Sequence, residues 1–375
     1  MERTRDRYLI HSIVHASKLL DAFQTPGEAL RLTDLIERTG FTKATAFRLL
    51  YTLEKCGMVE RSGEHQYRSN LRCAQRRKYR IGYAAQEHDY LFWRDVSISV
   101  ARAAEAEGIE LIVADNLNGS KAALRNADFF VRERVNLAME FQADELIAPI
   151  ISAKYQEAGI PLIAIEIPHP GSTYFGANNY EAGLMGGRYL ARWAKQHWGG
   201  EVEEVVFLEL PRAGSLPRSR LTGMLVGMKE VLRELDNVSV FYINGDGRFG
   251  PSLEAVRKHL RERETKKTLV GAINDPSALG ALRAFEECGR AWSCAVMSQN
   301  ASPEGRRELR APHTRLIGSV AYFAERYGEG LIRLAMSILG HKPVPPAVFV
   351  KHQVITPENV NHYYPNDELT AGMAG

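Results

Sequence analysis

The sequence predicts an α/β protein with two domains: a small, mostly helical amino-terminal domain, and a larger domain of parallel sheets flanked by helices. Its 375 residues exceed the roughly 250 to 300 that a single hydrophobic core serves. Helical apolar spacing dominates the first part of the chain, and beyond residue 80 short β-rich runs alternate with helical stretches. We therefore expect a first domain over residues 1–70, a basic linker over 71–79, a second domain over 80–365 and a tail over 366–375.

Composition indicates a soluble globular protein. Hydrophobic residues make up 45% of the chain and charged residues 25%, and no apolar run approaches the ~18 residues of a membrane span. The amino terminus lacks the apolar segment of a secretory signal, so we expect a cytoplasmic location and no membrane partner. Four cysteines occur without a C-x-x-C pair, which predicts neither a disulfide framework nor a metal site.

The charge is distributed unevenly along the chain. Residues 1–80 hold 16 Lys and Arg against 9 Asp and Glu, whereas the remainder holds 32 against 36. This asymmetry favours a polyanionic partner for the first segment alone. The alternative is a basic tail that is simply solvated.

Three helices and a hairpin are expected in the first domain. Apolar residues at three- and four-residue spacing predict a helix over Ser12–Phe23. A second, shorter helix has Thr33 as its N-cap and stops at Gly40; a third is capped by Thr42 and ends at Gly57. The segments 58–61 and 65–68 flank a turn and predict a wing. The short turn between the second and third helices is typical of a helix-turn-helix.

The third helix is the candidate for reading DNA, because the start of this helix enters the major groove. We expect Phe47, Leu50 and Leu53 to pack inward, which leaves the polar residues near the helix start exposed. Arg48 is suited to a guanine edge, a contact worth ~1 to 3 kcal/mol of discrimination, and Lys43 and the wing arginines are suited to phosphates. The predicted DNA-binding residues are Thr42, Lys43, Thr45, Arg48, Arg61 and Arg68. The alternative is a winged helix that binds a protein.

Four segments, over residues 12–23, 32–40, 42–53 and 57–61, resemble in this order the winged-helix domain of the IclR-type regulators. The resemblance implies DNA binding. It ends near residue 70, where members of that family usually continue into a GAF-like effector domain and this chain does not. The basic segment 71–80 has no apolar periodicity, and it is either a linker that touches DNA phosphates or an ordinary tether.

Nine β-rich runs alternate with amphipathic stretches after residue 80, which predicts parallel sheets covered by helices. Because nine strands are more than one small doubly wound sheet needs, we expect two lobes, with a ligand bound between them beyond the carboxyl ends of the strands. The predicted strands are 81–85, 111–114, 146–149, 162–165, 205–210, 238–243, 269–273, 295–297 and 316–320.

Side chains at these strand ends are suited to the hydroxyl groups of a sugar-like ligand. Aromatic residues after the first strand can stack on a ring, and amide, carboxylate and guanidinium groups follow later strands. Taken singly, each is better explained as a turn former, helix cap or core residue: Asn274 also begins a helix, and Phe92 and Trp93 also fit a core. The predicted ligand-binding residues are Gln86, Tyr90, Phe92, Trp93, Glu166, Arg220, Asn274, Asn300 and Tyr322.

The order of these groups resembles the type I periplasmic binding protein fold, in the sugar-binding branch shared with LacI-type regulators. Residues 90–93 match the stacking aromatics of that family, residues 220–223 its R-x-x-G, and residues 274–282 its N-D-x-x-A-x-G-A-L run. Glu166-Ile167 replaces the frequent Asp-Arg, and Asn300 replaces a later Asp, so the resemblance implies an altered or less anionic ligand site. The linker lacks the A-R-x-L-A hinge helix of LacI-type proteins.

The sequence thus predicts a ligand-responsive transcriptional regulator that binds duplex operator DNA and a monosaccharide or similar effector, without a cofactor. A homodimer is expected because one helix-turn-helix reads only a half-site. Catalysis is not expected: Gly245–Gly250 spells G-x-G-x-x-G, but one such match is weak. His11 and His15 lack a third metal ligand. The alternative function is a cytoplasmic sugar sensor whose winged helix binds a protein.

Overall fold

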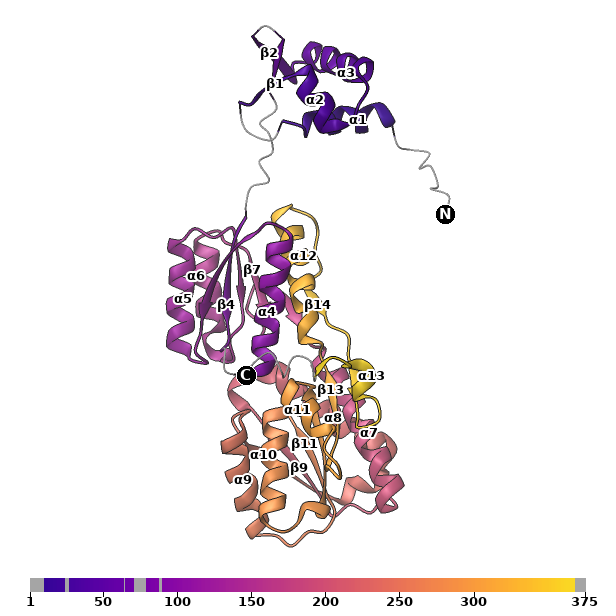
Figure 1. The fold of residues 1–375 in the computed structure, drawn as a ribbon. Helices are drawn as coiled ribbons and strands as arrows, with labels where there is room; N and C mark the ends of the chain where they lie inside the picture. Colours follow the sequence, from indigo (N-terminus) through magenta and orange to yellow (C-terminus); the bar gives the residue numbers. More distant parts are fainter. Residues whose placement is uncertain (1–9, 24–26, 64, 71–78, 88–89, 368–375) are drawn as a thin grey trace. The chain divides into compact units, whose positions relative to one another are not determined.

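A computed structural model describes residues 10–23, 27–63, 65–70, 79–87 and 90–367 of the chain. It divides into two compact units, residues 1–79 and residues 80–375, which are described separately (Figure 1). Within the described ranges, no helix is long and apolar enough to cross a membrane.

The first unit consists of three helices and a small antiparallel sheet. Helices α1 (His11–Leu20), α2 (Leu32–Thr39) and α3 (Lys43–Lys55) accompany strands β1 (Ala29–Arg31), β2 (Val59–Gly63) and β3 (Gln66–Ser69), in the order β1-β3-β2. Thr42 is the N-cap of α3, as predicted, and its side chain accepts a hydrogen bond from the backbone N–H of Thr45 at 3.3 Å. The predicted N-cap at Thr33 is wrong, because α2 begins at Leu32 and Arg31 occupies that position.

One expectation about the core of this unit is also wrong. Phe47 is 50% exposed, because α3 turns Ala46, Leu50 and Leu53 toward the other elements and Phe47 lies outside that stripe. On α1, Ile13 and Val14 are exposed and Leu19 is the buried residue. The core of the unit gathers Leu19, Phe23, Leu30, Leu35, Ala46, Leu50, Leu53 and Val59.

The second unit has two lobes, each built on a six-stranded sheet. The first lobe orders its strands β14-β8-β7-β6-β4-β5, and all neighbours in this sheet are parallel. Helices α4 (Leu91–Ala106) and α12 (Tyr327–Leu339) pack together on one face, and α5 (Ser120–Arg132) and α6 (Ala148–Glu157) pack on the other (Figure 1). The strands are β4 (Arg80–Ala85), β5 (Glu110–Asp115), β6 (Leu137–Glu140), β7 (Leu162–Ile165), β8 (Thr173–Gly176) and β14 (Ala347–Phe349).

The second lobe orders its strands β10-β9-β11-β12-β13-β15, in which only the β13–β15 pair is antiparallel. Helices α7 (Asn179–Trp198) and α8 (Ser215–Val231) pack so closely that a Cβ on Gly187 would lie 2.0 Å from the carbonyl oxygen of Met224. The remaining helices are α9 (Phe249–Arg261), α10 (Asp275–Glu287), α11 (Pro303–Leu309) and α13 (Val360–Tyr363). The strands are β9 (Glu204–Glu209), β10 (Ser239–Asn244), β11 (Thr268–Ala272), β12 (Cys294–Asn300), β13 (Leu316–Ala321) and β15 (Gln353–Ile355).

The chain passes between the lobes three times, over residues 176–179, 321–327 and 349–353. Since two of these passages leave the carboxyl ends of β8 and β13, the carboxyl ends of both parallel sheets face the junction between the lobes. This is the edge at which open parallel sheets bind ligands.

One predicted strand, over residues 146–149, is wrong. A 3₁₀ turn over Glu145–Ile147 leads there into α6, whose first turn contains Pro149, a position where a helix tolerates proline. Leu146, which contributed to the apolar run, is 82% exposed. The strand of this region is β6, which the sequence analysis missed because it is short and ends in the charged residue Glu140.

Candidate nucleic-acid and ligand sites

The start of α3 carries most of the predicted DNA-binding residues. The hydroxyls of Thr42 and Thr45 lie 2.9 Å apart and fix the first turn of the helix. Lys43 and Arg48 are exposed on the same helix. Thr42 therefore acts as a cap, and the two exposed cations are the groups on the first turns that are available to an anion.

The predicted wing residues differ in their surroundings. The Arg61 Nε atom lies 3.2 Å from a carboxylate oxygen of Glu54, and its guanidinium lies 5.8 Å from the centre of the Tyr67 ring. Arg68 is exposed on β3. Arg61 would thus have to share its charge between Glu54 and a phosphate.

In the second unit, the predicted aromatic residues lie at the start of α4. Phe92 is buried and meets Tyr322 and Tyr327 edge to face, with ring centres 6.3 and 5.9 Å away. Tyr90 and Trp93 are half-buried, and their ring centres lie 4.7 Å apart. Phe92 therefore packs like a core residue between the lobes, while Tyr90 and Trp93 form a partly accessible aromatic pair.

Glu166 and Arg220 form a buried ion pair between the lobes. Glu166 follows β7 in the first lobe and Arg220 lies on α8 in the second, with 2.9 Å between Oε2 and Nη2. Arg220 also donates from Nε to the Asn179 side chain and from Nη1 to the Ile273 carbonyl. The other carboxylate oxygen of Glu166 accepts from the Tyr327 hydroxyl at 2.6 Å and from the Ala177 N–H at 3.0 Å. The carboxylate therefore neutralises the guanidinium without any ligand.

Asn274 and Tyr322 already have partners within the protein. Asn274 is the N-cap of α10, where its Oδ1 accepts from the Ser277 N–H and its Nδ2 donates to the Gly247 carbonyl. The buried Tyr322 hydroxyl donates to Oε1 of Gln299 at 3.0 Å, and the ring lies 4.9 Å from the Arg220 guanidinium. These contacts match the helix-cap and core roles that the sequence analysis weighed for such residues.

Several buried amide atoms at the facing strand ends have no hydrogen-bond partner among the described residues. Two belong to predicted residues: Oε1 of Gln86, after β4, and Oδ1 of Asn300, at the end of β12. Two more, which the sequence analysis missed, are the Nε2 atoms of Gln142 and Gln299. An unpaired buried polar group costs ~1 to 3 kcal/mol, so a ligand that pairs these atoms would recover that energy. Gln142 could have been found only by predicting β6, which it closely follows.

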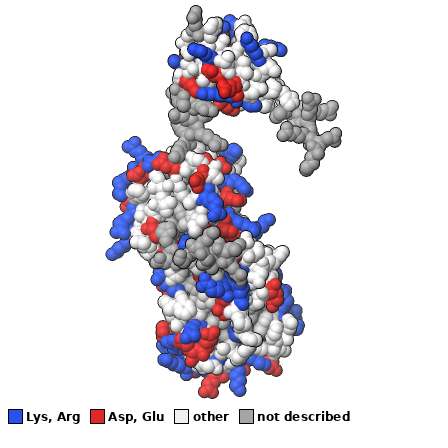
Figure 2. Space-filling view, in the orientation of Figure 1, with Lys and Arg blue, Asp and Glu red and all other residues white. Residues whose placement is uncertain are grey.

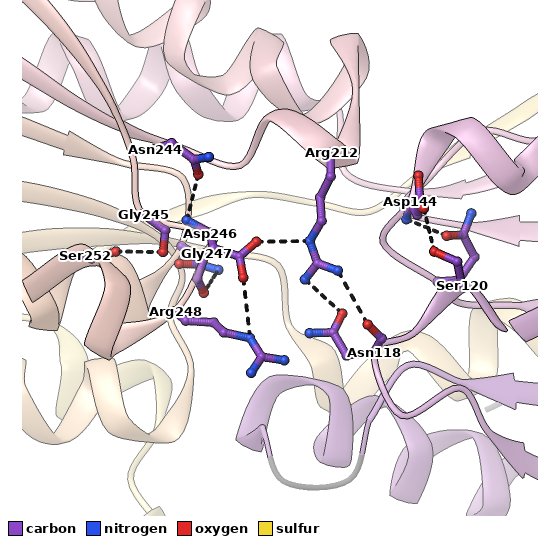
Figure 3. A network of polar contacts seen from close by, with 12 residues as sticks. Asn118, Ser120, Asp144, Arg212, Asn244, Gly245, Asp246, Gly247, Arg248 and Ser252 are labelled. Atoms are coloured by element: carbon purple, nitrogen blue, oxygen red, sulfur yellow. Dashed lines mark hydrogen bonds and ion pairs between the residues drawn. The ribbon is translucent and has the colours of Figure 1, made fainter. Parts of the chain in front are cut away.

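A further set of polar contacts, here called the interlobe latch, joins the lobes at the β5 and β10 edges of their sheets (Figure 3). Arg212, after β9, donates to the Asn118 side chain at 3.0 Å and lies 3.1 Å from Asp246. Arg248 lies 3.5 Å from Glu87 and 5.5 Å from the centre of the Tyr90 ring. Asp246 and Arg248 belong to the Gly245–Gly250 segment: Arg248 of this G-x-G-x-x-G match contacts the first lobe, and Asp246 pairs with Arg212 and Arg248 within the second lobe.

The first lobe also buries a carboxyl group beside this junction. Burial raises the pKa of Glu140 to about 8, against a smaller lowering effect of hydrogen bonds from Asn116 and Tyr155. The Asn116 amide donates to Glu140 at 2.8 Å and the Tyr155 hydroxyl lies at 3.4 Å. Burial therefore favours the neutral form of the Glu140 carboxyl in the folded protein.

A pocket of about 660 Å³ lies elsewhere, in the second lobe near the carboxyl end of α7, with Lys195, Glu230 and Lys267 in its wall. None of the predicted ligand-binding residues lines it. Within the described ranges, no group of three or more His, Cys, Asp or Glu side chains is arranged to hold a metal ion.

Comparison with known proteins agrees with this architecture. The family described as periplasmic binding protein domain matches residues 81–343, and the IclR helix-turn-helix domain matches residues 12–63. No curated protein matches the chain.

Solved structures with the same fold include three solute-binding proteins of ABC transporters. The protein from Actinobacillus succinogenes 130z with bound D-allose is 16% identical, with a TM-score of 0.67 over 76% of this chain and 100% of its own. The protein from Bacillus halodurans C-125 with bound myo-inositol is 18% identical, with a TM-score of 0.66 over 77% and 98%. The protein from Mycobacterium smegmatis with bound glycerol is 18% identical, with a TM-score of 0.68 over 76% and 96%.

The two sheets with facing carboxyl ends, the three passages between lobes and the match over residues 81–343 lead to one conclusion. The chain belongs to the periplasmic binding protein domain family and carries an IclR-type helix-turn-helix domain ahead of it.

Proposed function

We propose that this protein is a ligand-responsive transcriptional regulator of the cytoplasm. Its first unit binds operator DNA, and its second unit binds a small polyhydroxy compound between the lobes. The observation that carries the proposal is the presence, in one chain, of a helix-turn-helix and a two-lobed domain whose facing strand ends hold buried, unpaired amide atoms.

The proposed ligand is an uncharged monosaccharide or polyol. Glu166 and Arg220, the ion pair at the junction, neutralise each other. The unpaired atoms of Gln86, Gln142 and Asn300 are amide donors and acceptors, which suit hydroxyl groups. The D-allose, myo-inositol and glycerol bound to the three relatives belong to the same chemical class. Tyr90 and Trp93 offer aromatic surface for a ring face.

Communication between the units follows from population shift. A ligand changes operator affinity only if it binds one arrangement of the lobes better than another. A coupling of ~1 to 3 kcal/mol would change operator affinity about 5- to 150-fold. We further propose a homodimer, since paired helix-turn-helix units match palindromic operators.

The test begins with calorimetry of the full chain against monosaccharides and polyols that include D-allose, myo-inositol and glycerol. Operator DNA selected from a random duplex library is then titrated with and without the best binder. We expect Gln86→Met and Asn300→Gly to weaken ligand binding at least tenfold without loosening ligand-free operator binding, because each removes an unpaired amide atom at the junction.

The matched control is Ser152→Ala, which removes another buried, unpaired polar atom from α6. It should leave ligand affinity unchanged. The ligand assignment is wrong if both junction variants bind the best compound as tightly as wild type does. The regulatory role is wrong if that compound leaves operator affinity unaltered.

A further inference from the structure

Helix α3 presents two aromatic side chains to solvent. Phe47 is 50% exposed and Tyr51 is 52% exposed, and they lie one helical turn apart, outside the buried stripe of Ala46, Leu50 and Leu53. Arg48 is exposed beside Phe47. Large apolar side chains that remain exposed at this spacing mark a surface that meets a partner.

The charges around these aromatics define that partner. The exposed residues of α3 are Lys43, Ala44, Phe47, Arg48, Tyr51, Thr52 and Lys55, and none of them is acidic. The acidic residue of the helix, Glu54, is less exposed and pairs with Arg61 instead. The Lys55 ammonium lies 5.5 Å from the centre of the Tyr51 ring. The partner is therefore negatively charged but offers apolar groups to the aromatic rings.

The major groove of DNA has this combination, because phosphates line it and the C5-methyl group of each thymine projects into it. Figure 2 shows both acidic and basic residues on the visible face of the second unit. Residues near the start of a recognition helix reach base edges, and Phe47 is the fifth residue of α3. Tyr51 lies roughly 6 Å farther along the helix axis.

We propose that Phe47 reads a thymine through its methyl group, next to a guanine bound by Arg48, and that Tyr51 packs against the DNA backbone beyond them. The proposal rests on the operator binding proposed above and names the base that the apolar part of the helix recognises. Each operator half-site then contains an adjacent guanine and thymine whose order is fixed by the direction of α3.

The experiment uses the full chain and the duplex selected from a random library. Each thymine of the duplex is replaced in turn by deoxyuridine, which removes one methyl group and nothing else. We expect one position per half-site at which the replacement weakens binding about 3- to 5-fold, the effect of one buried methyl group. Phe47→Ala should weaken binding to the thymine duplex by at least that factor and abolish the difference between thymine and deoxyuridine there.

Two variants serve as controls. Ile13→Ala removes another exposed apolar side chain, 63% exposed, from α1 and should retain the full deoxyuridine effect. Arg48→Ala should relax the preference for guanine, and it should also retain the full deoxyuridine effect.

Failure to select any sequence would overturn both the operator binding and this proposal. If a sequence is selected, operator binding stands. Methyl reading by Phe47 is then wrong if no thymine is sensitive to replacement by deoxyuridine, or if Phe47→Ala keeps that sensitivity. If Phe47→Ala binds the operator with unchanged affinity, methyl reading by Phe47 is also wrong, and the aromatic face would then point to a protein partner. The deoxyuridine scan of the wild-type chain can still refute the proposal if Phe47→Ala fails to fold, because methyl reading requires a sensitive thymine.

Discussion

Removing either partner of the ion pair between Glu166 and Arg220 should destabilise the two-lobed unit strongly. The two side chains are only 7% and 9% exposed, and their charged atoms are 2.9 Å apart. In Arg220→Met the carboxylate stays buried with only the Tyr327 hydroxyl and the Ala177 N–H as donors. In Glu166→Gln an amide NH₂ can face the guanidinium. Each change should lower the free energy of unfolding by ~3 to 5 kcal/mol, the cost of leaving one buried charge uncompensated.

A double-mutant cycle separates this pairing from other effects of the substitutions. The variant with both changes no longer contains an unpaired charge at this position, so its loss should be smaller than the sum of the single losses by ~1 to 3 kcal/mol. The assay is urea unfolding of the full chain at pH 7, followed by far-ultraviolet circular dichroism. The same variants should weaken binding of the best ligand, because the pair joins the lobes.

The control is the pair between Arg188 and Glu230, which joins the adjacent helices α7 and α8 but is 39% and 43% exposed. Arg188→Met and Glu230→Gln should leave the urea midpoint nearly unchanged, because water already solvates both charges. If the decreases in the free energy of unfolding caused by the changes at Glu166 and Arg220 simply add in the double variant, the two charges are not energetically coupled. The reasoning from their burial is then refuted.

Two further predictions concern the junction. Arg212→Ala and Arg248→Ala should each weaken binding of the best ligand by up to about fivefold, mainly through faster dissociation in stopped-flow measurements. The first change removes the hydrogen bond that Arg212 donates across the junction to Asn118, worth ~1 kcal/mol. The second removes the partly exposed interlobe ion pair between Arg248 and Glu87, worth ~0.2 to 1 kcal/mol. Arg257→Ala, whose partners Glu254 and Glu287 both belong to the second lobe, is the control, and an equal effect there would contradict the role of the latch. Glu140 keeps its proton up to a pKa of about 8 in the folded chain but loses it near its ordinary pKa of 4.5 when unfolded. Its contribution to stability is therefore complete below pH 4.5 and is lost as the pH rises toward 8. Glu140→Gln should reduce the loss of stability that calorimetric melts show between pH 5 and pH 8. If the stability of variant and wild type falls in parallel over this range, Glu140 is not the source of the loss.

The sequence predicted those elements whose signals are local. The cap at Thr42 and the stop at Gly40 lie next to the turn that they define, so the helix-turn-helix followed from short segments. Most buried strands were found because their apolar runs are nearly continuous. The strand β6 was missed because burial of Glu140 depends on Asn116 and Tyr155, which are distant in sequence.

The contacts between the lobes could not be predicted from sequence patterns. Arg212 and Asp246 are ordinary polar loop residues until the fold brings β9 and β10 beside each other and Asn118 across from them. Arg220 was selected by resemblance as a ligand-binding residue. Its pairing with Glu166 appears only when both lobes are in place.

The misplacement of Phe47 has a different cause. Leu50 lies three residues from Phe47 and four from Ala46, so helical spacing alone fits an inward stripe that begins at either residue. The other elements decide between them: the core of the first unit includes Ala46, and Phe47 is left half exposed. A sequence rule that places large apolar residues inside must fail where function requires one outside. The failure at Phe47 therefore coincides with the position at which we propose that the protein reads a thymine.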